Sequence, residues 1–163
     1  MHLYDQAETR LGKFWIGCGP EGITRIHPAV NAPVAFEADY RKQVGVRPER
    51  GAIPESYIRA LREAAAGQSF NAVPIDLRSL TRFQQKVLKI LQQTPRGEVR
   101  TYAWLARKSG HPKAARAVGN VMARNPVPIL IPCHRVVPTA GGIGNYGLGA
   151  AMKRQLLLSE GVP

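Results

Sequence analysis

A three-residue break, Gly110-His111-Pro112, separates two helical stretches in the second half of the chain. On its N-terminal side, Thr101 is a suitable N-cap for a helix over 102–108. On its C-terminal side, a second helix is expected over 113–124. Two short helices joined by a glycine-containing turn form a helix-turn-helix pattern. This pattern constrains the fold more than any other feature, because it requires a compact helical unit in the C-terminal half.

Periodicity and helix-breaking residues indicate what surrounds this pair. Residues 81–93 are amphipathic with Thr81 as a suitable N-cap, and residues 150–159 are expected to form the last helix. A short apolar run at 129–131 is expected to be buried. Five glycines between positions 138 and 149 predict a loop.

The first half of the chain has a mixed character. Strands are expected over three short apolar runs, 11–18, 23–26 and 72–77. A helix is expected over 54–66, whereas 31–54 is rich in Pro, Arg and Gly, has no clear period and is expected to be loop. We therefore predict an α+β fold with a small N-terminal domain, residues 1–77, that contains a β-sheet. A C-terminal domain of the winged-helix type is predicted to span residues 78–163.

The charge of the chain is strongly positive, with 23 Lys and Arg residues against 11 Asp and Glu residues and a net charge of +12. Such an excess attracts polyanions, and nucleic acid is the leading candidate partner. An anionic membrane surface and simple solubility are the alternatives. No apolar run reaches 18 residues and the N-terminus does not resemble a signal peptide, so we expect an intracellular protein without a membrane partner.

The segment Ile131-Pro132-Cys133-His134-Arg135-Val136-Val137 carries the clearest chemical signal. A cysteine becomes a nucleophile where a base or a positive environment favours its thiolate. Neighbouring side chains of an extended strand point to opposite faces, so contact between Cys133 and His134 requires a local bend or a bridging water. These residues alone support a reactive and a buried structural cysteine equally. Cys18, before a turn, is expected to be structural.

The second helix of the pair is unusually rich in small residues. It offers Ala114, Ala115, Ala117 and Gly119 around a single Arg116. Typical major-groove readers instead expose Arg, Asn and Gln to base edges. Small side chains let a helix backbone approach DNA closely, although a tightly packed core helix has the same composition.

Taken together, these motifs resemble the O6-alkylguanine-DNA alkyltransferases, also called methylated-DNA–protein-cysteine methyltransferases. The resemblance covers roughly residues 80–163. It is carried by Arg100-Thr101-Tyr102, by the runs 110–119 and 125–137, and by Asn145-Tyr146. It implies DNA repair by direct reversal: after nucleotide flipping, an alkyl group passes irreversibly from O6 of guanine, and less readily from O4 of thymine, to Cys133.

The resemblance also implies roles for individual residues. The implied catalytic residues are Cys133 as acceptor, His134 as its base through a water, Glu160 as the carboxylate that orients the histidine, Asn125 as the residue that holds the nearby turn, and Tyr102 as the donor to N3 of guanine. The implied DNA contacts are Arg116, which would fill the space left by the flipped nucleotide, and Tyr102, Gln84, Ala103, His111, Ala115, Gly119 and Thr139. The implied substrate pocket is formed by Met122, Pro128, Tyr146 and Lys153.

No cofactor is implied, and the partner is double-stranded DNA bound by a monomer in the cytoplasm, associated with the nucleoid in a prokaryote. We expect no metal, because the N-terminal half offers only Cys18, His2 and His27 for the zinc site of some members. Leu148 stands where several members have glycine, which leaves the size limit of the alkyl pocket open. The alternative function is a non-enzymatic helix-turn-helix DNA binder or lesion sensor in which Cys133 is structural.

Overall fold

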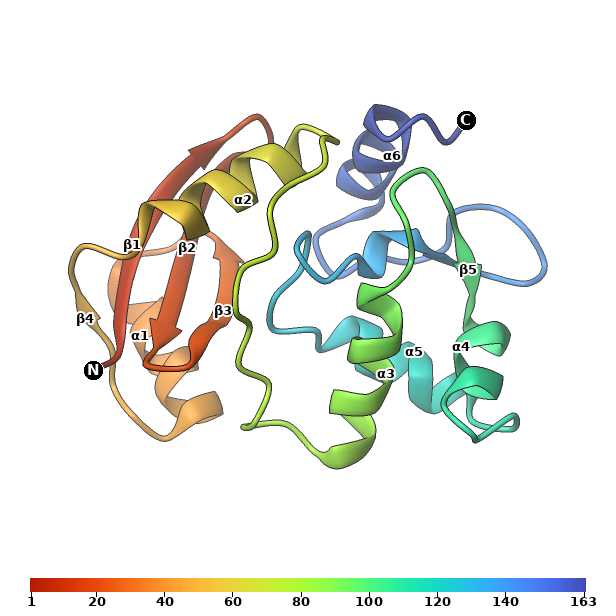
Figure 1. Ribbon diagram of the computed structural model, residues 1–163, viewed down its shortest axis with the longest axis horizontal. Coiled ribbons are helices and arrows are strands. Elements are labelled where there is room, and N and C mark those ends of the chain that lie inside the picture. The colour runs from red at the N-terminus through yellow and green to blue at the C-terminus, as the bar shows by residue number, and fades with distance from the viewer. The chain divides into compact units, whose positions relative to one another are not determined.

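The computed structural model describes residues 1–163, which form two compact units, residues 1–79 and 80–163 (Figure 1). The first unit combines a four-stranded sheet with helices, and the second is mainly helical with a two-stranded sheet. The α+β class predicted from the sequence is therefore confirmed. No helix is both long and apolar enough to cross a membrane.

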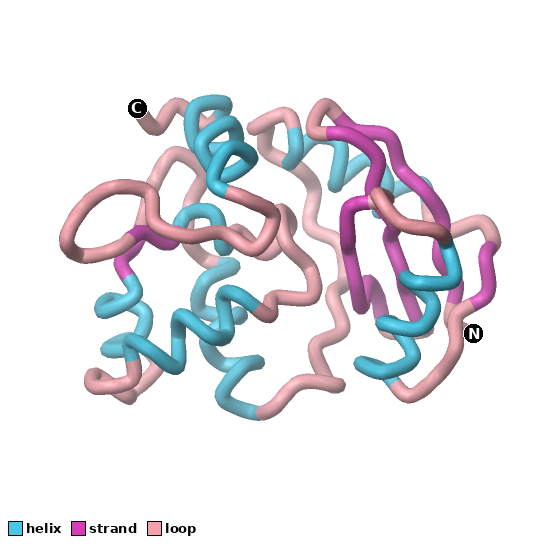
Figure 2. Tube along the Cα trace, turned by 180° about the vertical axis from the view of Figure 1, so that it is seen from behind, coloured by secondary structure: helices cyan, strands magenta, loops and turns pink.

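The sheet of the first unit has the strand order β3-β2-β1-β4 (Figure 2). Its strands are β1 (Leu3–Thr9), β2 (Gly12–Gly19), β3 (Gly22–Pro28) and β4 (Glu49–Arg50). The first three are antiparallel neighbours, and the two-residue β4 pairs in parallel with the start of β1. The sequence predicted most of β2 and β3 but not β1, in which only Tyr4 and Ala7 are buried.

Two helices belong to this unit, α1 (Pro33–Val44) and α2 (Glu55–Ala65). The predicted position of α2 is confirmed, but the loop predicted over 31–54 is wrong, because α1 occupies much of it. Pro33 suits the first turn of a helix, and Gly45 ends α1 with a φ of 88°, a left-handed conformation that favours glycine. Only Phe36 and Tyr40 of α1 are buried, so its sequence lacks a strong helical period.

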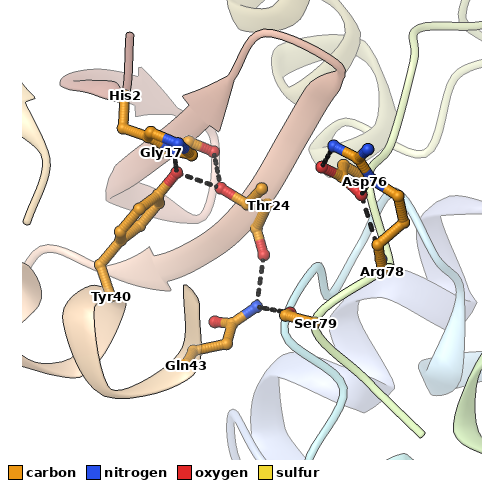
Figure 3. Close-up of polar contacts among 8 residues, drawn as sticks. All are labelled: His2, Gly17, Thr24, Tyr40, Gln43, Asp76, Arg78 and Ser79. Carbon is orange, nitrogen blue, oxygen red and sulfur yellow. Dashed lines mark hydrogen bonds and ion pairs between the residues drawn. The ribbon is translucent and has the colours of Figure 1, made fainter. Parts of the chain in front are cut away.

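The strand predicted over 72–77 is also wrong. Only Ile75 forms an isolated bridge with Ile23, while Ile23 N donates to Pro74 O at 2.9 Å and Asp76 N donates to Ile23 O at 2.8 Å. The segment thus covers the outer edge of β3 without continuing as a strand. Arg78, two residues after Asp76, forms an ion pair with it at 2.9 Å (Figure 3).

An aromatic cluster forms the core between the sheet and α1. It consists of Tyr4, Trp15, Phe36 and Tyr40, all of them at least 96% buried. Gly17 allows Tyr40 to approach the sheet, since a Cβ at this position would lie 2.6 Å from the Tyr40 ring. Aromatic rings that pack edge-on or tilted against one another, as these do, add to the stability that their burial supplies.

The Tyr40 hydroxyl is satisfied by a polar network within the same unit (Figure 3). It accepts from Thr24 Oγ1 at 2.7 Å and lies 2.9 Å from His2 Nδ1. Gln43, from the end of α1, donates to Thr24 O at 2.9 Å. Because buried polar groups are costly when unpaired, this network fixes α1 against the sheet in one arrangement.

The second unit contains four α-helices, a single turn of 3-10 helix and a two-stranded parallel ladder. The elements are α3 (Arg82–Gln92), β5 (Arg100–Thr101), α4 (Tyr102–Lys108), α5 (Ala115–Ala123), η1 (Cys133–Arg135), β6 (Val136–Val137) and α6 (Ala150–Ser159). The predicted helices over 102–108 and 150–159 are confirmed residue for residue. The helix predicted over 113–124 begins later, at Ala115, because Ala114 N still bonds to His111 O in a turn.

Threonine caps fix the start of two of these helices. Thr81 and Gln84 form a reciprocal capping box at the start of α3, and Thr101 accepts from Trp104 N at the start of α4. Both caps agree with the sequence-based prediction. The pair α4 and α5 forms the predicted helix-turn-helix, across a turn in which Gly110 has a φ of 85°.

Candidate active site

Cys133 lies in a helical turn rather than in an extended strand. Pro132 precedes the short helix η1, and Arg135 N bonds back to Pro132 O at 2.9 Å. Cys133 and His134 are therefore not forced to opposite faces, and the local bend required by the sequence argument is present. Both residues are buried, with exposed fractions of 5% and 0%.

Asn125 holds the chain segment that leads to the cysteine. Its amide nitrogen donates to Ile131 O at 3.0 Å and to Cys133 Sγ at 3.1 Å, while its amide oxygen accepts from Val127 N at 3.0 Å. Ile129, which lies in the chain between Val127 and Ile131, has a φ of 75°, which a β-branched residue rarely adopts. One side chain thus spans a strained loop and contacts the sulfur.

A buried chain of side chains extends from His134. Its Nε2 lies 3.1 Å from Glu160 Oε2, and the Glu160 carboxylate accepts two bonds from Arg135, from Nε at 2.9 Å and from Nη2 at 2.7 Å. Arg135 Nη1 also donates to Thr94 O at 2.8 Å. Glu160 follows α6 and Thr94 follows α3, so three separate segments meet at this ion pair.

The surroundings set the proton positions in this chain. Burial alone raises the pKa of Glu160, but its bonds from His134 and Arg135 outweigh burial and hold that pKa at about 2. Burial lowers the pKa of His134, although Glu160 opposes that shift. A neutral histidine that faces a carboxylate through Nε2 carries its hydrogen there, so Nδ1 is the basic nitrogen. His134 Nδ1 is buried and has no hydrogen-bond partner in the protein.

Burial also raises the pKa of the Cys133 thiol, while Asn125 and Lys153 act in the opposite direction. Lys153 is fully buried, and its ammonium donates to Val136 O at 2.6 Å and to Asn145 O at 3.1 Å. Burial lowers the pKa of Lys153, and Cys133 opposes that shift. A cation of this kind stabilises a thiolate once a base removes the proton.

Cys133 lines a cavity of about 190 Å³. The lining residues are Tyr102, Gly119, Met122, Ala123, Cys133, Asn145, Tyr146 and Gly147. Met122 and Tyr146 were pocket residues in the sequence-based hypothesis. Pro128 and Lys153, from the same hypothesis, do not line the cavity, and neither does Leu148.

The sequence reasoning missed Ala123, Asn145 and Gly147 as cavity residues. Asn145 was part of the motif that carried the family resemblance, which is the signal that could have identified it. Burial raises the pKa of Tyr102 and of Tyr146, and the nearby Cys133 adds to both shifts. Both hydroxyls at the cavity therefore remain proton donors near neutral pH.

Helix α5 presents the expected small residues beside this cavity. Arg116 is exposed, Ala115 and Gly119 are half-buried, and a Cβ added at Gly119 would meet no atom within 4 Å. The predicted contacts elsewhere lie on separate elements: Ala103 is half-buried on α4, and Thr139 is exposed in the loop before α6.

Two further candidate DNA contacts have structural partners. The exposed His111 packs edge-on against the Phe83 ring at 5.5 Å, and half-buried Gln84 completes the capping box of α3. Gln84 thus has a role at the start of α3 that the family resemblance did not imply. No group of three or more His, Cys, Asp or Glu side chains is placed to hold a metal ion.

The net positive charge of the chain lies mostly in the second unit, because that unit has few carboxylates. Residues 80–163 carry 13 of the 23 Lys and Arg residues but only two of the 11 Asp and Glu residues, Glu98 and Glu160. Glu160 is buried in its ion pair, and Glu98 pairs with Arg100 at 3.2 Å. The surface of this unit therefore has almost no free carboxylate to repel a polyanion.

Comparison with known proteins places these features in a family. A family profile described as "6-O-methylguanine DNA methyltransferase, DNA binding domain" matches residues 82–162. The methylated-DNA–protein-cysteine methyltransferase of Mus musculus is 39% identical over 174 residues, covering 98% of this chain and 82% of the mouse protein. That of Mycobacterium leprae is 41% identical over 118 residues, covering 72% and 71%. The Homo sapiens relative is 56% identical over 80 residues, and this match spans only 39% of the human protein.

Solved structures agree with this result. The O6-methylguanine methyltransferase of Mycobacterium tuberculosis is 32% identical, with a TM-score of 0.79 over 98% of this chain and 93% of the other. The same organism's protein in complex with DNA has a TM-score of 0.78 over 97% and 92%. The O6-methylguanine-DNA methyltransferase of Pyrococcus kodakaraensis is 30% identical, with a TM-score of 0.74 over 99% and 100%. The resemblance read from the motifs is confirmed, and the chain belongs to the methylated-DNA–protein-cysteine methyltransferase family.

Proposed function

We propose that this protein repairs DNA by moving an alkyl group from O6 of guanine to Cys133 Sγ. The sulfur attacks the alkyl carbon, the bond from that carbon to O6 breaks, and the proton lost by the thiol ends on the guanine. The observation that carries the proposal is the single cysteine at an open cavity, backed by the His134–Glu160–Arg135 chain. The product is a thioether that nothing in the site can cleave, so each molecule acts once.

The proton of Cys133 leaves through His134. Because Glu160 occupies the Nε2 side, Nδ1 receives the proton, through a water as the family resemblance implies. The thiolate is then stabilised by the Asn125 amide and by the buried Lys153 ammonium. This arrangement generates the nucleophile only when a base is in place, in keeping with a thiol whose pKa burial raises.

Tyr102 stabilises the guanine leaving group. Its side chain lines the cavity that Cys133 lines, and its raised pKa keeps the hydroxyl protonated. Donation from this hydroxyl to N3 stabilises the guanine anion as it forms. Met122 and Tyr146 enclose the base with mainly apolar surface.

Access to the target requires that the nucleotide leave the duplex. The small residues of α5 allow the backbone to come close to the DNA, and Arg116 is free on the same helix to fill the space left by the flipped nucleotide. We further propose that the protein acts without a cofactor, as a monomer, on cytoplasmic or nucleoid DNA. O4-alkylthymine is a weaker substrate in this proposal.

The test is incubation with duplex DNA containing O6-methylguanine, followed by intact-protein and peptide mass spectrometry. We expect one added methylene per molecule, located on Cys133. Cys133→Ser should bind DNA but gain no mass, whereas Cys18→Ser, the matched control, should react like the natural protein. Transfer by Cys133→Ser, or loss of transfer only in Cys18→Ser, would contradict the proposal. A folded protein that binds DNA but never gains mass would favour a lesion sensor.

A further inference from the structure

All three guanidinium nitrogens of Arg135 donate hydrogen bonds inside the protein. Nε and Nη2 form a bidentate pair with Glu160 at 2.9 and 2.7 Å, and Nη1 bonds to Thr94 O at 2.8 Å. Only 12% of its side chain is exposed. Arg135 belongs to the cysteine motif itself, and each of its guanidinium nitrogens already bonds to an oxygen inside the protein, so we look for its function within the site.

The position of Glu160 creates an electrostatic problem for a base. A buried carboxylate 3.1 Å from a histidine favours the imidazolium, and an imidazolium cannot accept a proton from the thiol. The same carboxylate oxygen is 2.7 Å from Arg135 Nη2, so a full positive charge already offsets it. Glu160 can then orient His134 through a hydrogen bond without forcing protonation.

We infer that Arg135 is a positioning residue for alkyl transfer: it neutralises Glu160 and fixes it against Nε2, so that His134 remains a neutral base with Nδ1 available. The inference rests on the proposed function, because the base matters only if Cys133 reacts. It assigns the arginine of the cysteine motif a part in setting the pH range of the reaction. It does not require Arg135 to touch the substrate.

The other groups that face His134 do not replace this effect. Cys133 is its neighbour in η1, and the Tyr146 ring from the loop before α6 lies 6.4 Å away, edge-on. Lys153 on α6 acts on the His134 pKa in the same direction as Arg135 and opposite to Glu160. Lys153 is held by two carbonyls and does not bond to Glu160. Only Arg135 both binds and neutralises the carboxylate.

The experiment is the pH dependence of Cys133 alkylation by free O6-benzylguanine, which avoids any effect on DNA binding. In Arg135→Met the Glu160 charge is uncompensated, so the His134–Glu160 pair takes up its proton at higher pH. The acid limb of the rate profile should move upward by ~1–3 pH units, as expected for loss of a nearby charge. The plateau rate of the variant at alkaline pH should also fall, because the bidentate contact that fixes Glu160 is lost together with the charge.

Arg135→Lys separates charge from geometry. It keeps the positive charge but loses the bidentate fork, so its acid limb should lie near that of the natural protein while its plateau rate falls. Val87→Ala is the control, because Val87 is an apolar residue fully buried on α3, and its truncation lowers stability without altering any charge. Its acid limb should not move.

His134 titration by NMR in the unreactive Cys133→Ser background provides a readout independent of transfer. An upward shift of the His134 titration in Arg135→Met supports the inference even if the alkyl-transfer proposal fails. Lower stability with an unchanged titration and an unchanged acid limb would show that Arg135 serves only the fold. If Arg135→Met does not fold, the inference is tested by Arg135→Lys, whose titration should stay near that of the natural protein. A large shift in Arg135→Lys would overturn it.

Discussion

Replacement of Gly119 by alanine should stabilise the protein and impair its repair of DNA. Gly119 lies inside α5, and a Cβ there would meet no atom within 4 Å. Glycine in a helix interior costs about 0.5–1 kcal/mol relative to alanine. Since nothing in the fold requires glycine here, Gly119→Ala should raise the free energy of unfolding by that amount. For a chain of this size the midpoint of thermal unfolding should rise by roughly 1–4 °C.

The same methyl group would be added to a residue that lines the cavity, on the helix proposed to approach DNA. Transfer from duplex O6-methylguanine should therefore slow by about tenfold or more, equivalent to ~1.4 kcal/mol of the barrier. Transfer from free O6-benzylguanine should slow less, because no DNA backbone has to approach α5.

The assay for Gly119→Ala combines thermal unfolding with single-turnover alkylation of both substrates. Ala117→Gly is the matched control, since this exposed residue of α5 does not line the cavity. It should lose a similar amount of stability with less effect on transfer. A Gly119→Ala protein that is more stable and repairs duplex DNA at the natural rate would refute the proposed close approach.

Three other predictions follow from the charges and contacts of the second unit. Arg116→Ala should slow transfer from duplex DNA far more than transfer from free O6-benzylguanine, because a free base needs no flipping; equal losses in the two rates would assign Arg116 to the fold. Affinity for undamaged duplexes should fall steeply as salt rises. The binding free energy should vary between sequences by less than the ~1–3 kcal/mol of one good bidentate base contact. A flat salt response or a hundredfold sequence preference in titrations would favour a transcriptional regulator. The free energy of unfolding should fall in acid. The Glu160 pKa of about 2, against an ordinary 4.5, contributes roughly 3 kcal/mol to it above pH 4.5, and this contribution is lost as the pH falls toward 2. The lowered pKa of His134 adds a loss of stability that begins below its ordinary value of 6.5, and urea unfolding between pH 7 and 2 measures both losses.

Local signals in the sequence predicted most of the second unit. The caps Thr81 and Thr101 and the periodic apolar residues of α3 act within a few positions of each other, so they can be read without knowing the fold. Helix α1 could not be read in this way, because it buries only Phe36 and Tyr40. Its position depends on the aromatic cluster with Tyr4 and Trp15, which lie on strands far away in the sequence.

Only part of the candidate site could be predicted from the sequence, for a related reason. The motif itself identified Cys133 and His134, but Glu160 lies 26 positions from His134 and was assigned by family resemblance. Lys153 resembles an ordinary solvated residue of a terminal helix. It is buried because the carbonyls of Val136 and Asn145 receive its ammonium, and no sequence pattern reports that contact.

The distribution of charge separates the two tasks proposed for the second unit. On the surface, cations greatly outnumber carboxylates, which favours any DNA without regard to its sequence. Inside, the Glu160 charge is matched by Arg135, and Lys153 is the buried cation without a carboxylate partner. A Cys133 thiolate is the anion that would balance Lys153, whereas the thiol and the thioether are both neutral. In the proposed reaction the Lys153 charge opposes the rise in the Cys133 pKa that burial causes, and so makes the thiolate that attacks the alkyl carbon less costly to form.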